Sequence, residues 1–117
     1  MAKNLAPSSP AALKEQLCRL VPTFASDWED PAPLEEETPD TFHSIMREFT
    51  YSFGKAAHAL PEAQLKKLGN LVNASVEQAG TLENAMATCF LEHLHQVKAL
   101  KVLWPHLSQK ARSECHA

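Results

Sequence analysis

Glycine and β-branched residues are scarce in this chain. Only three glycines occur, Gly54, Gly69 and Gly80, and valine, isoleucine and threonine form no runs. A β-sandwich or barrel needs frequent turn residues and strands rich in β-branched side chains, so the composition disfavours both. Alanine, leucine, glutamate, lysine and glutamine, which are good helix formers, dominate instead. The composition therefore predicts an all-α fold.

The sequence also lacks any long apolar stretch. Nothing approaches the roughly 18 apolar residues of a membrane span, and no apolar core of a signal peptide follows residues 1–4. Cys18, Cys89 and Cys115 form an odd, widely spaced set without a Cys-x-x-Cys pair. We expect the first two to be buried free thiols and Cys115 to lie in a frayed tail. Free thiols fit a reducing compartment, so we expect a cytoplasmic protein without membrane contact.

Metal-binding spacings are missing as well. The six histidines contain no His-Glu-x-x-His pair, and His93 and His95, at i and i+2, would point about 200° apart on a helix. The Glu-x-x-His match of di-iron bundles occurs once, from Glu92 to His95, whereas such a site takes one from each of two helices. The terminal Cys115-His116 pair supplies only two ligands. We therefore expect no metal and no cofactor.

Nucleophilic and phosphate chemistry have little support either. Cys89 lies on an apolar stripe with no base beside it in sequence, so a fold would have to bring His43 or His58 to it. Three isolated glycines cannot build a phosphate-binding loop, and a net charge of −3 without a clustered basic face disfavours nucleic acid. We expect no catalytic residues; an enzyme that uses Cys89 or a histidine cluster is the weakest alternative.

Capping signals and apolar periodicity divide the chain into four main helices and a short C-terminal one. The predicted starts are Ser9-Pro10, Thr38-Pro39-Asp40, Pro61 and Thr81, with Pro22 ending or restarting the first helix and Pro105 opening a last helix of roughly 105–113. The fourth helix keeps its apolar period for about six turns. Very short links at 60–61 and 80–81 favour antiparallel neighbours. The sequence thus predicts a single domain over 1–117, an antiparallel helical bundle after a loose lead-in at 1–8.

Two features of these helices bear on packing. The second helix carries one apolar stripe, in which Gly54 favours the close approach of another element rather than a break. Glu77 and Glu92 lie on otherwise apolar helices. Each is either exposed to solvent or half-buried with its carboxylate bonded across the bundle. The stripe consists of Phe42, Ile45, Met46, Phe49, Phe53, Ala56, Ala57 and Leu60.

The strongest departure from randomness is an acidic, proline-containing segment at 27–40. It carries a net charge of −7, because it holds half of the fourteen acidic residues and no basic one, whereas 1–26 and 41–117 each carry +2. One interpretation is a solvated linker, the usual role of a charge run. The other is a contact surface, in which carboxylates steer a basic partner and apolar residues anchor it. The expected partner-binding residues are Asp27, Trp28, Glu29, Asp30, Leu34, Glu35, Glu36, Glu37, Asp40, His43 and Arg47.

The second half of the chain resembles a known family. The residues that carry the likeness are Leu60-Pro61, Leu68, Val76-Glu77, Gly80, Asn84-Ala85, Thr88 and Leu91-Glu92-x-Leu94. Over residues 40–100 this diffuse helical pattern resembles small bacterial helical domains that are similar to immunity proteins encoded beside polymorphic or secreted toxins. The resemblance implies a cytoplasmic protein that binds and blocks a cognate toxin without chemistry of its own. The acidic segment lies outside the matched region.

Two functions from different classes follow from these observations. The first is an immunity protein that binds a toxin or effector domain, for example a basic, nuclease-like one, through the segment 27–40 and an adjacent helix face. The second is a small regulatory or adaptor domain whose helices form a homodimer. Light scattering separates them, since a tight homodimer favours the second.

Overall fold

The computed structural model describes residue 7 and residues 9–28, 41–78, 80–94 and 96–115, without the side chains of residues 26–28. In these parts of the chain every regular element is a helix, which confirms the all-α prediction. The α-helices are α1 (Pro10–Leu20), α2 (Pro22–Trp28), α3 (Phe42–Ala56), α4 (Glu62–Val76), α5 (Thr81–Ala85), α6 (Leu100–Leu103) and α7 (Gln109–Ser113). Among these helices none combines the length and apolar character needed to cross a membrane.

The predicted start of α1 is confirmed, and that of α3 is wrong by one turn. The Ser9 side chain accepts a hydrogen bond from the Ala12 amide, and Pro10 opens the helix. The cap of α3 is Thr41 rather than Thr38, which lies outside the described residues. Thr41 and Ser44 bond each other's backbone amides at 3.0 and 2.9 Å, a reciprocal capping box that satisfies two donors at once.

The fourth helix does not run unbroken to Leu103 as predicted. After α5 the chain winds into a π-helix, η2 (Met86–Phe90), then a 3-10 turn, η3 (Leu91–His93), and it turns again before α6. Lys98 has a left-handed backbone with φ 62°, which no α-helix tolerates. The regular spacing of apolar residues, from which one long helix was predicted, continues through the break. It does so because Leu91 and Leu94 are buried there although the helix is interrupted.

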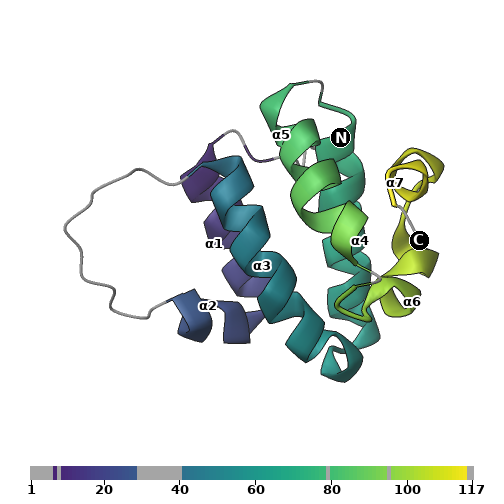
Figure 1. The fold of residues 1–117 in the computed structure, drawn as a ribbon. Helices are drawn as coiled ribbons and strands as arrows, with labels where there is room; N and C mark the ends of the chain where they lie inside the picture. The colour runs from purple at the N-terminus through teal and green to yellow at the C-terminus, as the bar shows by residue number, and fades with distance from the viewer. Residues whose placement is uncertain (1–6, 8, 29–40, 79, 95, 116–117) are drawn as a thin grey trace.

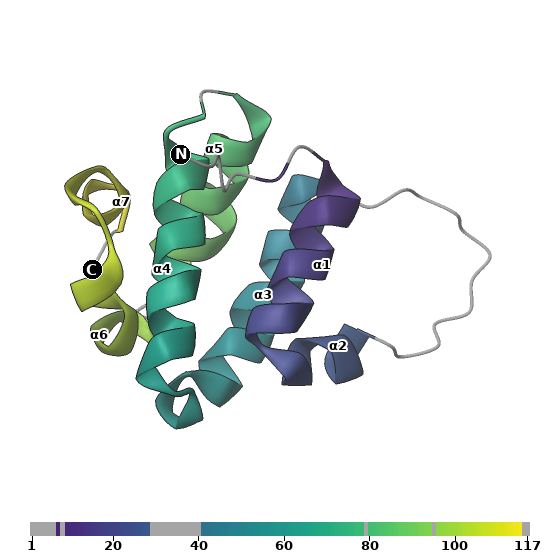
Figure 2. The same cartoon turned by 180° about the vertical axis from the view of Figure 1, so that it is seen from behind.

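Helices α3 and α4 form the middle of the molecule and are joined at one end by η1 (Ala57–Ala59) (Figure 1). Helix α4 packs against α1 on one side and against α6, η4 (Trp104–His106) and α7 on the other (Figure 2). Helix α3 packs against α1, α2 and η2. The α5–η2 segment contacts both central helices and therefore closes the core between them.

The core is centred on phenylalanine side chains from three elements. Phe49 of α3 lies 5.1 Å from Phe24 of α2 and 5.6 Å from Phe90 of η2, measured between ring centroids. Phe53 packs on Phe49 and Phe90 at 5.7 Å. Such rings contribute roughly 0.5–1.5 kcal/mol per pair beyond the area they bury. The predicted stripe of α3 is thus confirmed as its buried face.

Gly54 has the role that the sequence predicted for it. A Cβ on Gly54 would come within 2.7 Å of the Val97 Cβ, so α3 and the turn before α6 approach closely there. Glu77 is exposed, as the first alternative predicted for it, and Glu92 is half-buried. Cys115 lies partly buried against the core, so the expectation of a frayed tail is wrong at this residue.

Candidate functional site

The structure describes two of the eleven predicted partner-binding side chains. Asp27 and Trp28 lie in α2, but their side chains are outside the description. Glu29, Asp30, Leu34, Glu35, Glu36, Glu37 and Asp40 are outside the described residues altogether. His43 and Arg47 are placed on α3, directly after the acidic segment in the chain.

His43, Arg47 and Tyr51 form one surface stripe along α3, which we call the α3 stripe. They are spaced by four residues, which brings successive side chains to neighbouring positions on a helix. The His43 Nε2 lies 2.7 Å from the Asn84 Oδ1, a bond that fixes the imidazole against α5. Arg47 is exposed, and 65% of Tyr51 is accessible to solvent. The structure therefore brings the two predicted residues together and adds an exposed aromatic ring to them.

Tyr51 was missed by the sequence reasoning, although a signal for it was present. It is the single tyrosine of the chain, and it lies off the apolar stripe of α3 at i+4 from Arg47. Among the described residues, only Tyr51 and Trp104 are large apolar side chains classed as exposed. Exposed tyrosine and tryptophan beside arginine are typical of residues that dominate binding energy at protein interfaces.

Beside the α3 stripe the surface is hollowed between α3 and the η2–Val97 segment. We call this feature, of about 310 Å³, the Arg47 hollow. It is lined by Arg47, Thr50, Tyr51, Thr88, Cys89, His93, Gln96 and Val97. The lining combines one guanidinium, a phenol, an imidazole, an amide and a thiol with apolar carbon. Such a mixture suits the binding of a polar group that also carries an apolar body.

A buried hydroxyl joins the two walls of this hollow. The Thr50 Oγ1 lies 2.7 Å from the carbonyl oxygen of Met46 on its own helix and 2.7 Å from that of Cys89 in η2. A π-helix shifts the register of its backbone hydrogen bonds, and such turns often occur at functional sites. Here Thr50 supplies the Cys89 carbonyl with a donor from outside its helix.

Cys89 does not meet the histidines that sequence reasoning considered for it. His43 bonds Asn84, and the His58 Nε2 lies 2.9 Å from the carbonyl oxygen of Lys98. The histidine that shares the hollow with Cys89 is His93, whose Nδ1 lies 2.9 Å from the Gln96 Oε1. Because an amide oxygen only accepts, that ring nitrogen carries the proton.

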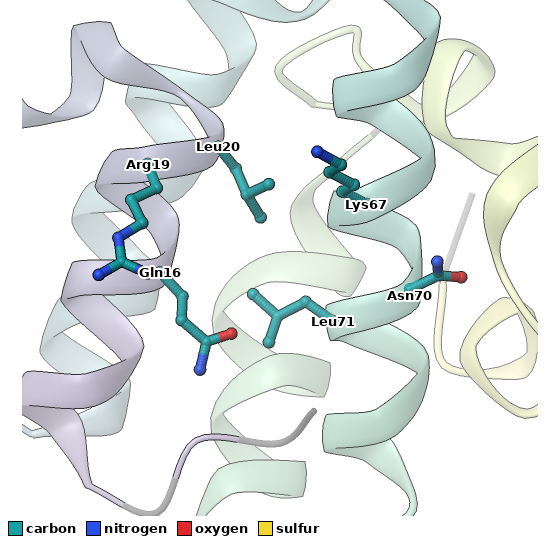
Figure 3. Close-up of a pocket in the computed structure, with 6 residues that line it drawn as sticks. All are labelled: Gln16, Arg19, Leu20, Lys67, Asn70 and Leu71. Atoms are coloured by element: carbon teal, nitrogen blue, oxygen red, sulfur yellow. The ribbon is translucent and has the colours of Figure 1, made fainter. Parts of the chain in front are cut away.

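A second depression lies between α1 and α4 (Figure 3). It has a volume of about 260 Å³ and is lined by Gln16, Arg19, Leu20, Lys67, Asn70 and Leu71. Leu20 and Leu71 point into it from opposite helices (Figure 3). Arg19 is already paired with Glu15 at 2.8 Å, one turn earlier on α1. The depression therefore offers an apolar floor beside a surface ion pair.

The corner formed by α6, η4 and α7 carries the other exposed aromatic ring. Trp104 is 38% exposed, and the Arg112 Cζ lies 4.9 Å from its ring centroid while the same guanidinium donates to the Trp104 carbonyl. Cys115 lies beside this ring. Burial, and to a smaller extent the Glu114 carboxylate, raises the pKa of Cys115 to about 11. The thiol is therefore protonated near neutral pH.

No group of three or more histidine, cysteine or acidic side chains lies close enough to hold a metal ion within the described ranges. No family model, curated protein or solved structure matches the chain.

Proposed function

We propose that this protein is a non-catalytic protein-binding domain of the immunity type, which binds a cognate toxin or effector domain and neutralises it. The proposal combines the resemblance over residues 40–100 with a binding surface on α3. Its partner is a protein, with no cofactor and no nucleic acid required. We place its action in the cytoplasm, where its three free thiols would persist.

The observation that carries the proposal is the exposed pair of Arg47 and Tyr51 on α3. Both residue types are enriched among interface hot spots, since they supply large contact area together with directional hydrogen bonds. Burying most of an exposed aromatic ring contributes roughly 1.5–3 kcal/mol to association. The pair lies on α3, whose cap Thr41 directly follows the acidic segment in the chain.

The segment 27–40 has a complementary role in this proposal. Seven carboxylates attract a basic partner over long range and raise the rate of encounter, whereas Arg47 and Tyr51 hold it at short range. The scaffold beneath is proposed to act as an antiparallel bundle of α1, α3, α4 and the α5–η2 segment. Such a bundle presents one rigid helix face to the partner.

The test begins with the reading frames beside this gene, of which a toxin-like one supplies the candidate partner. Wild-type protein is expected to bind that domain with one-to-one stoichiometry in calorimetry and to rescue growth of cells that express it. Tyr51→Ala is expected to weaken binding by about tenfold or more, by faster dissociation. Glu48→Ala, at an exposed position one residue from Arg47, is the matched control.

Neutralising the acidic segment tests the steering role separately. Replacing Glu35, Glu36 and Glu37 with glutamine is expected to slow association, most strongly at low salt, and to leave dissociation nearly unchanged. Unaltered association at low salt would remove the segment from the interface. Failure of every neighbouring toxin-like domain to bind would overturn the immunity proposal itself.

A homodimerising adaptor is the second candidate, and the exposure of Trp104 favours it. The ring lines a mostly apolar hollow together with Leu100, Lys101, Pro105 and Cys115. Light scattering of the isolated protein decides between the two functions. A dimer that Trp104→Ala dissociates supports the adaptor, whereas a monomer at micromolar concentration excludes a tight one.

A further inference from the structure

The Arg47 hollow is large enough for a small organic molecule. Its volume of about 310 Å³ lies at the lower end of natural small-molecule sites, which begin at about 300 Å³. It shares Arg47 and Tyr51 with the α3 stripe, so a small molecule bound here would compete with the proposed protein partner for these two side chains. The small molecule that the hollow itself would accept can be tested without the partner.

The walls of the hollow are fixed by contacts that do not involve a ligand. Thr50 ties α3 to the carbonyl of Cys89 at 2.7 Å, and the Thr88 Oγ1 donates to the carbonyl of Asn84 at 2.8 Å. At the other end Gly54 lets Val97 approach the backbone of α3. A site whose walls are already in place needs little reorganisation when it binds, which improves affinity for a given set of contacts.

The lining carries one permanent positive charge and no carboxylate. The Arg47 guanidinium is exposed and forms no ion pair within the part of the chain that the structure describes. Gln96 uses its oxygen to accept from His93, which leaves its two amide hydrogens available. The polar groups at this site therefore favour an acceptor that bears negative charge.

The charge balance distinguishes between two classes of anion. A guanidinium binds a carboxylate through two parallel hydrogen bonds, and one carboxylate neutralises it. A phosphate monoester carries roughly −1.5 to −2 near neutral pH and would keep uncompensated charge beside a single arginine. The Tyr51 ring and the Val97 side chain add apolar surface next to the charge.

We propose that the Arg47 hollow binds a small aromatic carboxylate, with its carboxylate on Arg47 and its ring against Tyr51 and Val97. An aromatic body matches the hollow better than an aliphatic acid, because a flat ring packs on the exposed phenol face with little loss of conformational entropy. The Gln96 amide group donates to a lone pair of the ligand carboxylate that Arg47 does not use. This binding requires no covalent step and no metal.

The experiment titrates the full chain with benzoate, benzamide and phenyl phosphate as probes. Backbone amide shifts of Thr88, Cys89 and Gln96 report occupancy by NMR. Benzoate is expected to bind with a Kd of about 1 mM or tighter, and benzamide about tenfold more weakly, since it lacks the charge. The Arg47→Gln variant is expected to bind benzoate only as weakly as the wild type binds benzamide. Arg19→Gln, an exposed arginine on α1, is the matched control and should leave binding unchanged.

Alkylation of the cysteines provides a second readout that does not depend on Arg47. Saturating benzoate is expected to slow iodoacetamide modification of Cys89, with no effect on Cys18 or Cys115, which lie outside the hollow. Equal binding of benzoate and benzamide, or full benzoate binding by Arg47→Gln, would overturn the proposal. Tighter binding of phenyl phosphate than of benzoate would overturn the carboxylate assignment. Protection of all three cysteines alike would show that benzoate does not act at the hollow.

Discussion

The Thr50 Oγ1 of α3 lies 2.7 Å from the backbone carbonyl oxygen of Cys89 in the π-helix, and its one proton is shared with the Met46 carbonyl of its own helix at the same distance. Thr50 and Cys89 are far apart in sequence, yet this bond fixes the distance between the two walls of the Arg47 hollow. Thr50 is buried and Cys89 is partly buried, and both residues line the hollow. The bond therefore couples the stability of the fold to the shape of the candidate site.

Thr50→Val is expected to destabilise the protein by about 1–3 kcal/mol, because it leaves the Cys89 carbonyl without this donor. Thr50→Ser keeps the hydroxyl and is expected to lower the free energy of unfolding by less than Thr50→Val does. Ser75→Ala is the matched control, since its buried hydroxyl bonds only the Leu71 carbonyl on its own helix at 2.8 Å. Urea unfolding measures all three. A Thr50→Val variant no less stable than Ser75→Ala would show that the interhelical bond contributes nothing.

The C-terminal corner depends on Asn73 of α4 in a similar way. The Asn73 side chain donates to the His106 carbonyl at 3.1 Å and accepts from the Ser108 amide at 2.7 Å. Ser108 is also the cap of α7. Asn73→Ala is therefore expected to cost about 2 kcal/mol and to increase hydrogen exchange throughout α7. Both effects should appear together.

Asn70, one turn earlier on α4 and exposed, provides the control for that change. Asn70→Ala is expected to alter stability by less than about 0.5 kcal/mol. If the two alanine variants melt at the same temperature, the bonds of Asn73 do not hold the corner.

The sequence predicted the helices well where the controlling interactions are local. Ser9-Pro10 and Pro61 mark the starts of α1 and α4, because a cap or a proline acts on its own turn. The break of the fourth helix was not predictable in this way. On either side of the break this segment contacts residues of α3: Thr50 at the Cys89 carbonyl and Gly54 at Val97.

A long-range ion pair of Glu62 was also beyond the reach of local spacing. Lys66 stands at i+4 from Glu62, the spacing that favours an ion pair within one helix, whereas in the structure Glu62 lies 3.1 Å from the His106 Nε2. Gly69 was not singled out from sequence, yet a Cβ there would come within 2.6 Å of the His106 carbonyl oxygen. Such contacts depend on how α4 meets η4, which no spacing within α4 indicates.

The partly buried thiol of Cys115 makes stability depend on alkaline pH. Its pKa is raised from an ordinary 9.0 to about 11 in the folded protein, chiefly by burial. The folded state therefore holds the thiol proton more tightly than the unfolded state. The contribution to stability is complete below pH 9.0 and is lost as the pH rises toward about 11.

The measurement compares urea unfolding of wild type and Cys115→Ala at several pH values. Between pH 9.0 and about 11 the wild type is expected to lose stability relative to Cys115→Ala, whereas at lower pH the difference between the two should stay constant. Other groups that titrate in this range are common to both proteins and cancel. A difference that does not change across the range would contradict the raised pKa.

Lys98 holds a backbone conformation that favours glycine, with φ 62° in the turn before α6. A left-handed conformation costs a residue with a Cβ about 1–2 kcal/mol, and glycine avoids that cost. Lys98→Gly is therefore expected to be more stable than Lys98→Ala by about 1 kcal/mol in urea unfolding. The exposed Lys101 in α6 supplies the opposite case, because glycine in a helix is about 1 kcal/mol less favourable than alanine. Lys101→Gly should therefore be less stable than Lys101→Ala. If glycine is the worse residue at both positions, the turn at Lys98 is not left-handed in solution, and the break between η3 and α6 would have to lie elsewhere.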